Sequence, residues 1–201
     1  MPEDTPPPNI TVQDFTEIEY VIDPQDRLLS MSAEWTTFAL ANQGDGLTPE
    51  EVAGRSLWHF IADEATRELY AAVLAHVRSG ATTDLVLRCD APERRRLIEM
   101  IVSRRPDGNV EFKTRLLAAK ARPVQRLRAK STPRTGQRLM VCTWCDRVHA
   151  GVEEWLEVEA ALEHLQLTHE TELPQVDPVV CPACFAKIME ALTPSAPAEV
   201  S

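Results

Sequence analysis

The sequence predicts an α+β protein with one antiparallel sheet in a larger first domain and a small, mainly helical second domain. Three observations lead to this prediction. Alternating apolar segments flank a helical middle between residues 12 and 121, a basic stretch without acidic residues follows, and two Cys-x-x-Cys pairs lie between residues 139 and 193. The 201 residues suffice for one ordinary domain and a small one.

The first predicted element after a proline-rich start is a β-hairpin. Residues 1–11 are polar and rich in proline, and we expect a disordered lead-in there. In residues 17–22 the apolar side chains Ile18, Tyr20 and Ile22 alternate with other residues, which is typical of a strand. Asp-Pro-Gln-Asp at 23–26 predicts a turn, and residues 27–31 a second strand.

Helical signals occupy the middle of the first domain. Ser32 can cap a helix, and Thr48 followed by Pro49 and Glu51 forms a capping-box pattern. Residues 63–79 predict a longer helix, because apolar residues recur at every fourth position and Gly80 follows as a C-cap.

Three further strands complete the predicted sheet. Residues 84–90, 95–105 and 110–116 show alternating apolar side chains, and Pro-Asp-Gly-Asn at 106–109 is a strong hairpin turn. The order is therefore two strands, a helical segment and three strands.

Charge is spread unevenly along the chain, whose net charge is −10. Residues 119–138 contain seven basic residues and no acidic one, and we interpret residues 122–138 as a solvated basic linker. Residues 139–201 contain two basic and eleven acidic residues. Neither predicted domain is basic, which disfavours nucleic acid as a partner.

The cysteine pairs give the most specific chemical signal. A two-residue gap allows both thiolates of a pair to bind one ion, and two pairs complete the tetrahedron that zinc prefers. Because the start of the chain lacks the pattern of a signal peptide, we expect a cytoplasmic protein with reduced thiols. The sequence therefore predicts a structural zinc site whose ligands are Cys142, Cys145, Cys181 and Cys184.

The second domain is predicted to be mainly helical around this site. Apolar residues 139–141 form a short strand before the first pair, and a helix is expected from Trp155. Pro182 stands at the first position of a final helix, so the second pair falls on its first turn. We expect disorder in residues 194–201.

Several other residues admit a chemical role but have a simpler interpretation. His149, His164 and His169 are expected at the surface, because four cysteines already complete a zinc site. Cys89 is expected to be a buried, inert thiol rather than a redox sensor. The arginines at 94–96 are interpreted as a solvated or ion-paired sheet edge rather than a phosphate site.

The sequence resembles a known family in three places. The order of elements, the segment Ala53-Gly-Arg-Ser-Leu-Trp-His-Phe-Ile61 and the stretch Leu87-Arg-Cys-Asp-Ala-Pro-Glu-Arg-Arg-Arg96 look like a PAS domain. Together with the Cys-x-Trp-Cys and Cys-Pro-x-Cys pairs, they resemble bacterial PAS proteins with a C-terminal zinc-binding segment. Val179 and Val180 stand where that group often has His-Gly.

The resemblance implies a PAS-like five-stranded sheet with a sensor role and an unknown ligand. It also makes a homodimer through this domain plausible, and it raises an axial haem role for His59, for which a packed surface histidine is the simpler interpretation.

The sequence favours a non-catalytic signalling or regulatory protein that acts through a protein partner. Residues 1–201 contain no P-loop or Rossmann glycine pattern, no kinase or cyclase signature, and no apolar run long enough to cross a membrane. Two alternatives stay open: a zinc-dependent nucleic-acid-binding transcriptional regulator, and a redox protein that uses one Cys-x-x-Cys pair.

Overall fold

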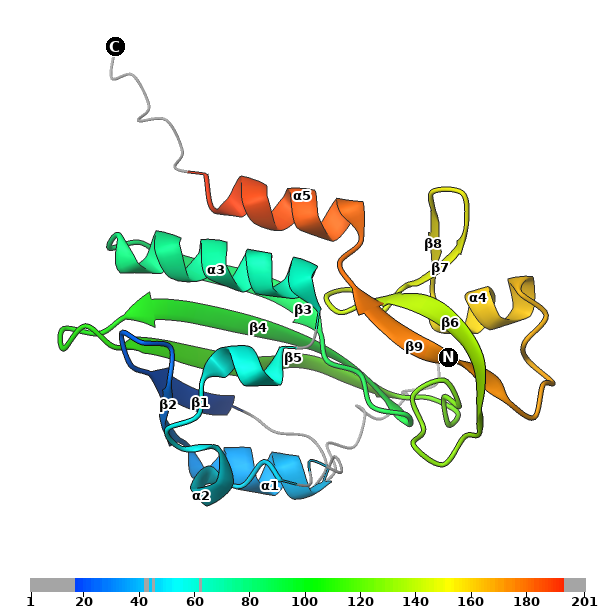
Figure 1. Cartoon of the computed structure of the whole chain (residues 1–201), viewed down its shortest axis with the longest axis horizontal. Coiled ribbons are helices and arrows are strands. Elements are labelled where there is room, and N and C mark those ends of the chain that lie inside the picture. Colours follow the sequence, from blue (N-terminus) through cyan, green and yellow to red (C-terminus); the bar gives the residue numbers. More distant parts are fainter. Residues whose placement is uncertain (1–16, 42–43, 45, 62, 194–201) are drawn as a thin grey trace, which may run out of the picture.

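A computed structural model describes residues 17–193 apart from 42–43, 45 and 62 (Figure 1). The predicted disordered ends at 1–11 and 194–201 lie outside the described residues. No helix in the described part of the chain is both long and apolar enough to span a membrane.

The first half is built on a five-stranded antiparallel sheet in the order β2-β1-β5-β4-β3. Its strands are β1 (Glu17–Ile22), β2 (Leu28–Met31), β3 (Thr82–Arg88), β4 (Arg94–Arg104) and β5 (Val110–Ala121). The predicted α+β class and the five-stranded antiparallel sheet are confirmed.

Four helical segments connect β2 to β3. They are α1 (Ala33–Ala41), α2 (Pro49–Val52), the 3₁₀ turn η1 (Leu57–Phe60) and α3 (Glu64–Arg78). The predicted capping box of Thr48 and Glu51 is present, and the Asp63 side chain accepts a 2.8 Å hydrogen bond from the amide of Thr66 at the start of α3. Gly80 has φ of 108°, as a left-handed C-cap requires.

The first core lies between the sheet and α3. Phe112 of β5 is completely buried and stacks on Tyr20 of β1 with ring centroids 4.5 Å apart. Leu69, Val73 and Val77 of α3 are at most 1% exposed and form its inner face. The apolar residues at every fourth position of the sequence therefore lie on the helix face that packs on the sheet.

Asp26 holds the first hairpin against the helices. It has φ of 62°, accepts a 2.9 Å hydrogen bond from the Trp58 indole, and pairs with Arg78 at 2.5 Å. Asp26→Ala should cost about 2 kcal/mol, because the indole N–H loses its acceptor and alanine is strained at positive φ. Asp26→Asn retains the acceptor and tolerates this φ, so it should cost less in urea unfolding; equal losses would contradict this role.

The second half is built on a four-stranded mixed sheet in the order β8-β7-β6-β9. Its elements are β6 (Arg134–Cys142), β7 (Val148–Gly151), β8 (Glu154–Leu156), α4 (Val158–His164), β9 (Leu173–Val179) and α5 (Pro182–Ala191). The prediction of a mainly helical second domain is wrong. The apolar stripe of α4 is real, but it packs on a sheet, with Val158 and Ala161 in a second core beside Val148.

The segment predicted as a solvated linker contributes to the packing. Leu127 is 1% exposed within the second core, the Arg122 side chain is 5% exposed, and Arg134 already begins β6. The segment is solvated only in part, because Gln125 and Leu127 are buried whereas Val124 is 56% exposed. That the two halves form separate domains on either side of residues 122–138 stays a prediction.

The first hydrophobic core extends into the second half. Helix α5 lies along α3 in Figure 1, and its buried side chains Ile188 and Leu192 belong to the same cluster as Leu69 and Val73 of α3. Cys142, Trp144 and Cys181 are part of this cluster. The cysteine pairs are therefore located where the second half packs on the first.

Candidate metal centre

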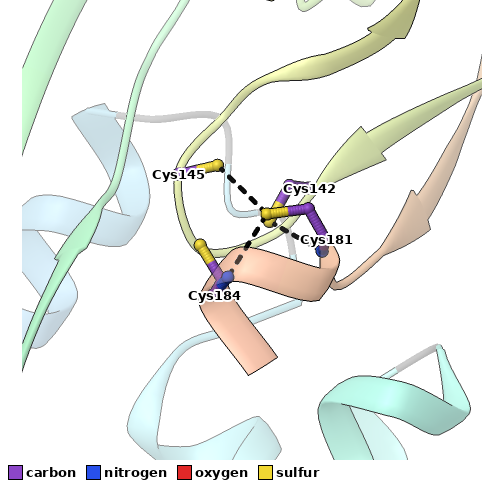
Figure 2. A group of neighbouring side chains, drawn as sticks. All are labelled: Cys142, Cys145, Cys181 and Cys184. Atoms are coloured by element: carbon purple, nitrogen blue, oxygen red, sulfur yellow. Dashed lines mark hydrogen bonds between the residues drawn. The ribbon is translucent and has the colours of Figure 1, made fainter. Parts of the chain in front are cut away.

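Four cysteines converge at the end of β6 and the start of α5 (Figure 2). Their Sγ atoms all lie within 4.8 Å of one another, and they are the group of metal-ligating side chains identified within the described residues. Cys142 and Cys181 are buried, whereas Cys145 and Cys184 are partly exposed. The four predicted ligand residues are thus brought together, and they could hold one metal ion.

The first pair lies on a tight turn over residues 142–147. The amide of Asp146 donates to the carbonyl of Cys142 at 3.0 Å, and the amide of Cys142 donates to the carbonyl of Arg147 at 2.8 Å. Asp146 has φ of 60°, a conformation that Asp tolerates better than most residues. This closed turn places both thiols of the pair on the same side.

The second pair lies on the first turn of α5, as predicted. Cys181 is the N-cap residue, its Sγ accepts a 3.5 Å hydrogen bond from the amide of Cys184, and Pro182 occupies the first helical position. The amide of Thr143 donates to the carbonyl of Val179 at 2.8 Å, and the amide of Cys181 donates to Cys142 Sγ at 3.3 Å. These bonds join the two pairs directly.

The sulfur geometry and charge suit a tetrahedral cation. A tetrahedron with zinc–sulfur bonds of about 2.3 Å has sulfur–sulfur edges of about 3.8 Å, and Cys145 Sγ lies 3.8 Å from Cys181 Sγ. Hydrogen bonds from the thiols of Cys145 and Cys184 lower the pKa of Cys142, whereas donation to Cys142 raises the pKa of Cys145 to about 12. One thiolate thus forms at the expense of its neighbours, and a divalent cation would allow all four to ionise.

The 142–147 turn is attached to the first half through several contacts. The carbonyl of Trp144 accepts a 2.8 Å hydrogen bond from the amide of Arg88 in β3, and the Trp144 ring lies 6.1 Å from the ring of Tyr70 in α3. The hydroxyl groups of Thr66 and Thr143 are 2.9 Å apart. Order in this turn therefore depends on both halves of the chain.

A buried group of charges adjoins the metal centre, and we name it the junction charge cluster. Asp90 has a completely buried side chain, pairs with Arg122 at 3.2 Å and with Arg88, and accepts a 2.9 Å hydrogen bond from the amide of Arg96. Asp146, next to the ligand Cys145, has a side chain 3% exposed. The junction charge cluster consists of five residues linked by ion pairs: Arg88, Asp90, Arg122, Arg128 and Asp146.

The ionisation of Asp90 follows from these partners. Burial alone would raise the pKa of Asp90, but the hydrogen bonds from Arg88 and from the Arg96 amide, with the charges of Arg88 and Arg122, outweigh it and lower the pKa. The side chain therefore stays ionised although it is buried. Of the cations after β5, Arg122 and Arg128 pair with acids in this cluster, Asp90 from the first half and Asp146 from the second.

The remaining candidate residues lie apart from the four sulfurs. His59, His164 and His169 are exposed, and His149 packs on Trp155 with ring centroids 5.2 Å apart. No histidine among the described residues belongs to the sulfur group. The His59 ring contacts Phe60 edge-on, with ring centroids 5.4 Å apart, which fits the packed surface histidine of the simpler interpretation.

The structure also bears on the predictions for the arginines at 94–96 and for Cys89. The arginines at 94–96 do not form a sheet edge, because β4 lies between β5 and β3; Arg94 and Arg96 are buried, and only Arg95 is partly exposed, paired with Glu157 and Glu159. Cys89 is partly rather than fully buried, and desolvation raises the pKa of its thiol, which disfavours the reactive thiolate as predicted.

Sequence reasoning missed the junction charge cluster and a cavity in the first half. The cavity measures about 330 Å³ and is lined by apolar and aromatic side chains, among them Tyr20, Trp35, Phe60 and Tyr70. The basic stretch at 119–138 was not a sufficient signal for the charge cluster, because solvated cations give the same sequence pattern.

Comparison with known proteins places few limits on this chain. No family model matches it, and no curated protein matches it. Among solved structures, a domain of an HTR-like protein from Haloarcula marismortui is similar over 51% of this chain and 98% of that chain, with 16% identity and a TM-score of 0.33. What defines the class is therefore the fold and site themselves: an α+β protein with a four-cysteine candidate metal centre.

Proposed function

We propose that the protein is a non-catalytic regulatory protein in which a PAS-like sensor module is joined to a structural zinc module that binds a protein partner. The convergence of Cys142, Cys145, Cys181 and Cys184 carries this proposal. Four thiolates complete a tetrahedral shell, which leaves no open position for a reacting water, so the site fits a structural role. We expect the reduced thiols of a cytoplasmic protein.

Zinc is the metal that fits this donor set best. Tetrahedral sulfur sites favour zinc, and zinc would here hold the 142–147 turn against the start of α5. Elemental analysis of purified protein should give one zinc per chain. Cys184→Ser should lose most of the zinc, whereas Cys89→Ser, the same change outside the site, should retain it. Equal zinc content in both variants would contradict the assignment.

The PAS-like assignment of the first half is supported by its architecture. An antiparallel five-stranded sheet has its helical segment inserted between β2 and β3, which is the order that the sequence resemblance implies. The cavity of about 330 Å³ between the sheet and these helices offers room for a small apolar ligand. The identity of that ligand is left open by its apolar lining.

A protein partner is favoured over nucleic acid by charge and by exposed apolar surface. The chain from residue 139 onward carries two basic and eleven acidic residues, and Arg88, Arg95 and Arg122 are ion-paired. On α5, Phe185 and Met189 are each 38% exposed and lie one turn apart beside the metal centre. Such side chains are typical anchors of protein interfaces.

Capture of partners from source cells tests this proposal. Wild-type protein should retain a partner that the double variant Phe185→Ser with Met189→Ser loses, whereas Leu40→Ser on α1, an exposed apolar residue far from the site in sequence, should retain it. Sedimentation of the same samples would reveal a homodimer. A DNA titration at physiological salt is the counter-test: tight, sequence-specific binding with no α5-dependent partner would favour a transcriptional regulator instead.

A further inference from the structure

A second cleft lies where the metal centre meets the first half of the molecule. It measures about 360 Å³ and adjoins the cavity of the first half, with which it shares Phe60, Ile61 and Tyr70. It differs from that cavity because Thr143 and Trp144 of the 142–147 turn form part of its wall. Asp63 and Thr66 at the start of α3 form the opposite part. Any molecule in this cleft would contact both halves at once.

One part of the cleft is aromatic. Phe60, Tyr70 and Trp144 contribute side chains to it, and the rings of Tyr70 and Trp144 lie 6.1 Å apart with their planes inclined by 47°. The faces of aromatic rings carry partial negative charge and attract cations, most strongly in tryptophan. This wall therefore accepts an apolar body and favours a positive charge near it.

The polar part of the cleft consists of acceptors. When the Thr143 hydroxyl donates to the carbonyl of Val179 at 3.3 Å, the Thr66 hydroxyl donates in the shared bond at 2.9 Å, and the lone pairs of Thr66 are then available to a ligand. One carboxylate oxygen of Asp63 accepts the amide of Thr66 at 2.8 Å. Its second oxygen has no hydrogen bond or ion pair within the described residues.

We propose that this cleft binds a small organic amine. The protonated nitrogen would donate to the second Asp63 oxygen and to the Thr66 hydroxyl, and the apolar part of the amine would lie between the rings of Phe60, Tyr70 and Trp144. A carboxylate or phosphate is disfavoured, because Asp63 would repel it. The charge of Asp63, the free acceptors and the aromatic wall all select the same chemistry.

The position of the cleft gives such a ligand a regulatory effect. Thr143 and Trp144 stand between the ligand residues Cys142 and Cys145, so an occupied cleft would stabilise the packing of the 142–147 turn on α3. Binding in the cleft stands on its own observations, whereas its role as an input signal rests on the proposed function. In that role the amine would favour the ordered state that the partner recognises.

Calorimetric titration of the full, zinc-loaded chain with phenethylamine tests the proposal, with 3-phenylpropionate as a probe of similar size and opposite charge. Phenethylamine should bind and 3-phenylpropionate should not. Asp63→Asn should weaken amine binding about tenfold or more, the usual loss for one hydrogen bond to a charged group. Glu68→Gln removes the same charge at an exposed position of α3 that does not line the cleft, and it should leave binding unchanged.

Zinc content and thermal stability of every sample separate the possible outcomes. If Asp63→Asn fails to fold, Asp63→Ser replaces it, since serine is an equally good N-cap residue without charge. A zinc-loaded protein that binds neither probe, binds both equally, or binds the amine equally with and without Asp63 would overturn the inference and leave the proposed function standing. Amine binding by a protein that holds no zinc would instead overturn the zinc module alone.

Discussion

Removal of the metal, or the change Cys184→Ser, is expected to unfold the region from residue 139 to 193 while β4 and β5 stay ordered. Structural zinc in small domains contributes an apparent binding free energy of about 10–16 kcal/mol, and this free energy stabilises the folded state of the segment around it. Here four thiols lie within 4.8 Å of one another, and without a cation the ionisation of Cys142 opposes that of its neighbours.

Amide hydrogen exchange measures this effect segment by segment. In the metal-free protein, α5 and the 142–147 turn should lose protection by several orders of magnitude, whereas the central strands of the first sheet should change little. Cys89→Ser is the matched control, because it removes a thiol that lies outside the sulfur group. A metal-free protein with a fully protected α5 would contradict this account.

Asp90→Ala is expected to destabilise the protein by about 3–5 kcal/mol, because it leaves the buried guanidinium of Arg122 without its closest acidic partner. The side chain of Asp90 is completely buried, and that of Arg122 is 5% exposed. Glu159→Ala is the control: this carboxylate also pairs with Arg122, at 3.6 Å, but its side chain is 46% exposed, so its loss should cost less than about 1 kcal/mol.

The pH dependence of unfolding checks the same carboxylate. Its pKa is lowered in the folded protein, so Asp90 contributes stability above its unfolded pKa of about 3.9, and this contribution is lost as the pH falls through the lower folded value. The wild-type protein should therefore lose stability between about pH 5 and more acidic values, and Asp90→Asn should lose less over the same range. Parallel pH profiles for the two proteins would show that Asp90 is not held by this network.

Local signals in the sequence predicted the first half well. The alternation in residues 17–22 and the caps at Thr48 and Gly80 act within a few residues, and the structure has each element where its signal lies. Strand ends were less accurate: β3 begins at Thr82 and β5 continues to Ala121, because pairing with β4 extends them beyond their alternating cores.

The second half was harder to predict because its signals are non-local. Strand β9 contains Pro174 and Pro178, which normally exclude a central strand, but β9 is at the edge of its sheet, where proline is tolerated. The hairpin of β7 and β8 is too short to show a clear alternation. Its pairing with β6 is set by the fold rather than by local sequence.

The candidate site, like the fold, could be predicted from the sequence only where the signal is local. The spacing within each pair predicted Cys142, Cys145, Cys181 and Cys184 as candidate ligands, and the structure brings their four sulfurs within 4.8 Å of one another. The buried partners around them could not be predicted, since Asp90, Arg122 and Asp146 are far apart in the sequence and meet only after the two sheets pack together. Such contacts carry no local periodicity.

Zinc-edge X-ray absorption of the purified, unmodified chain tests the central claim most directly. The account predicts one zinc per chain with four sulfur neighbours at about 2.3 Å and no nitrogen or oxygen in the first shell. Cys184→Ser should lower the sulfur count together with the zinc content. The four-cysteine centre would be contradicted if the purified protein bound no zinc even after zinc is added. It would also be contradicted if nitrogen or oxygen neighbours replaced two of the sulfurs.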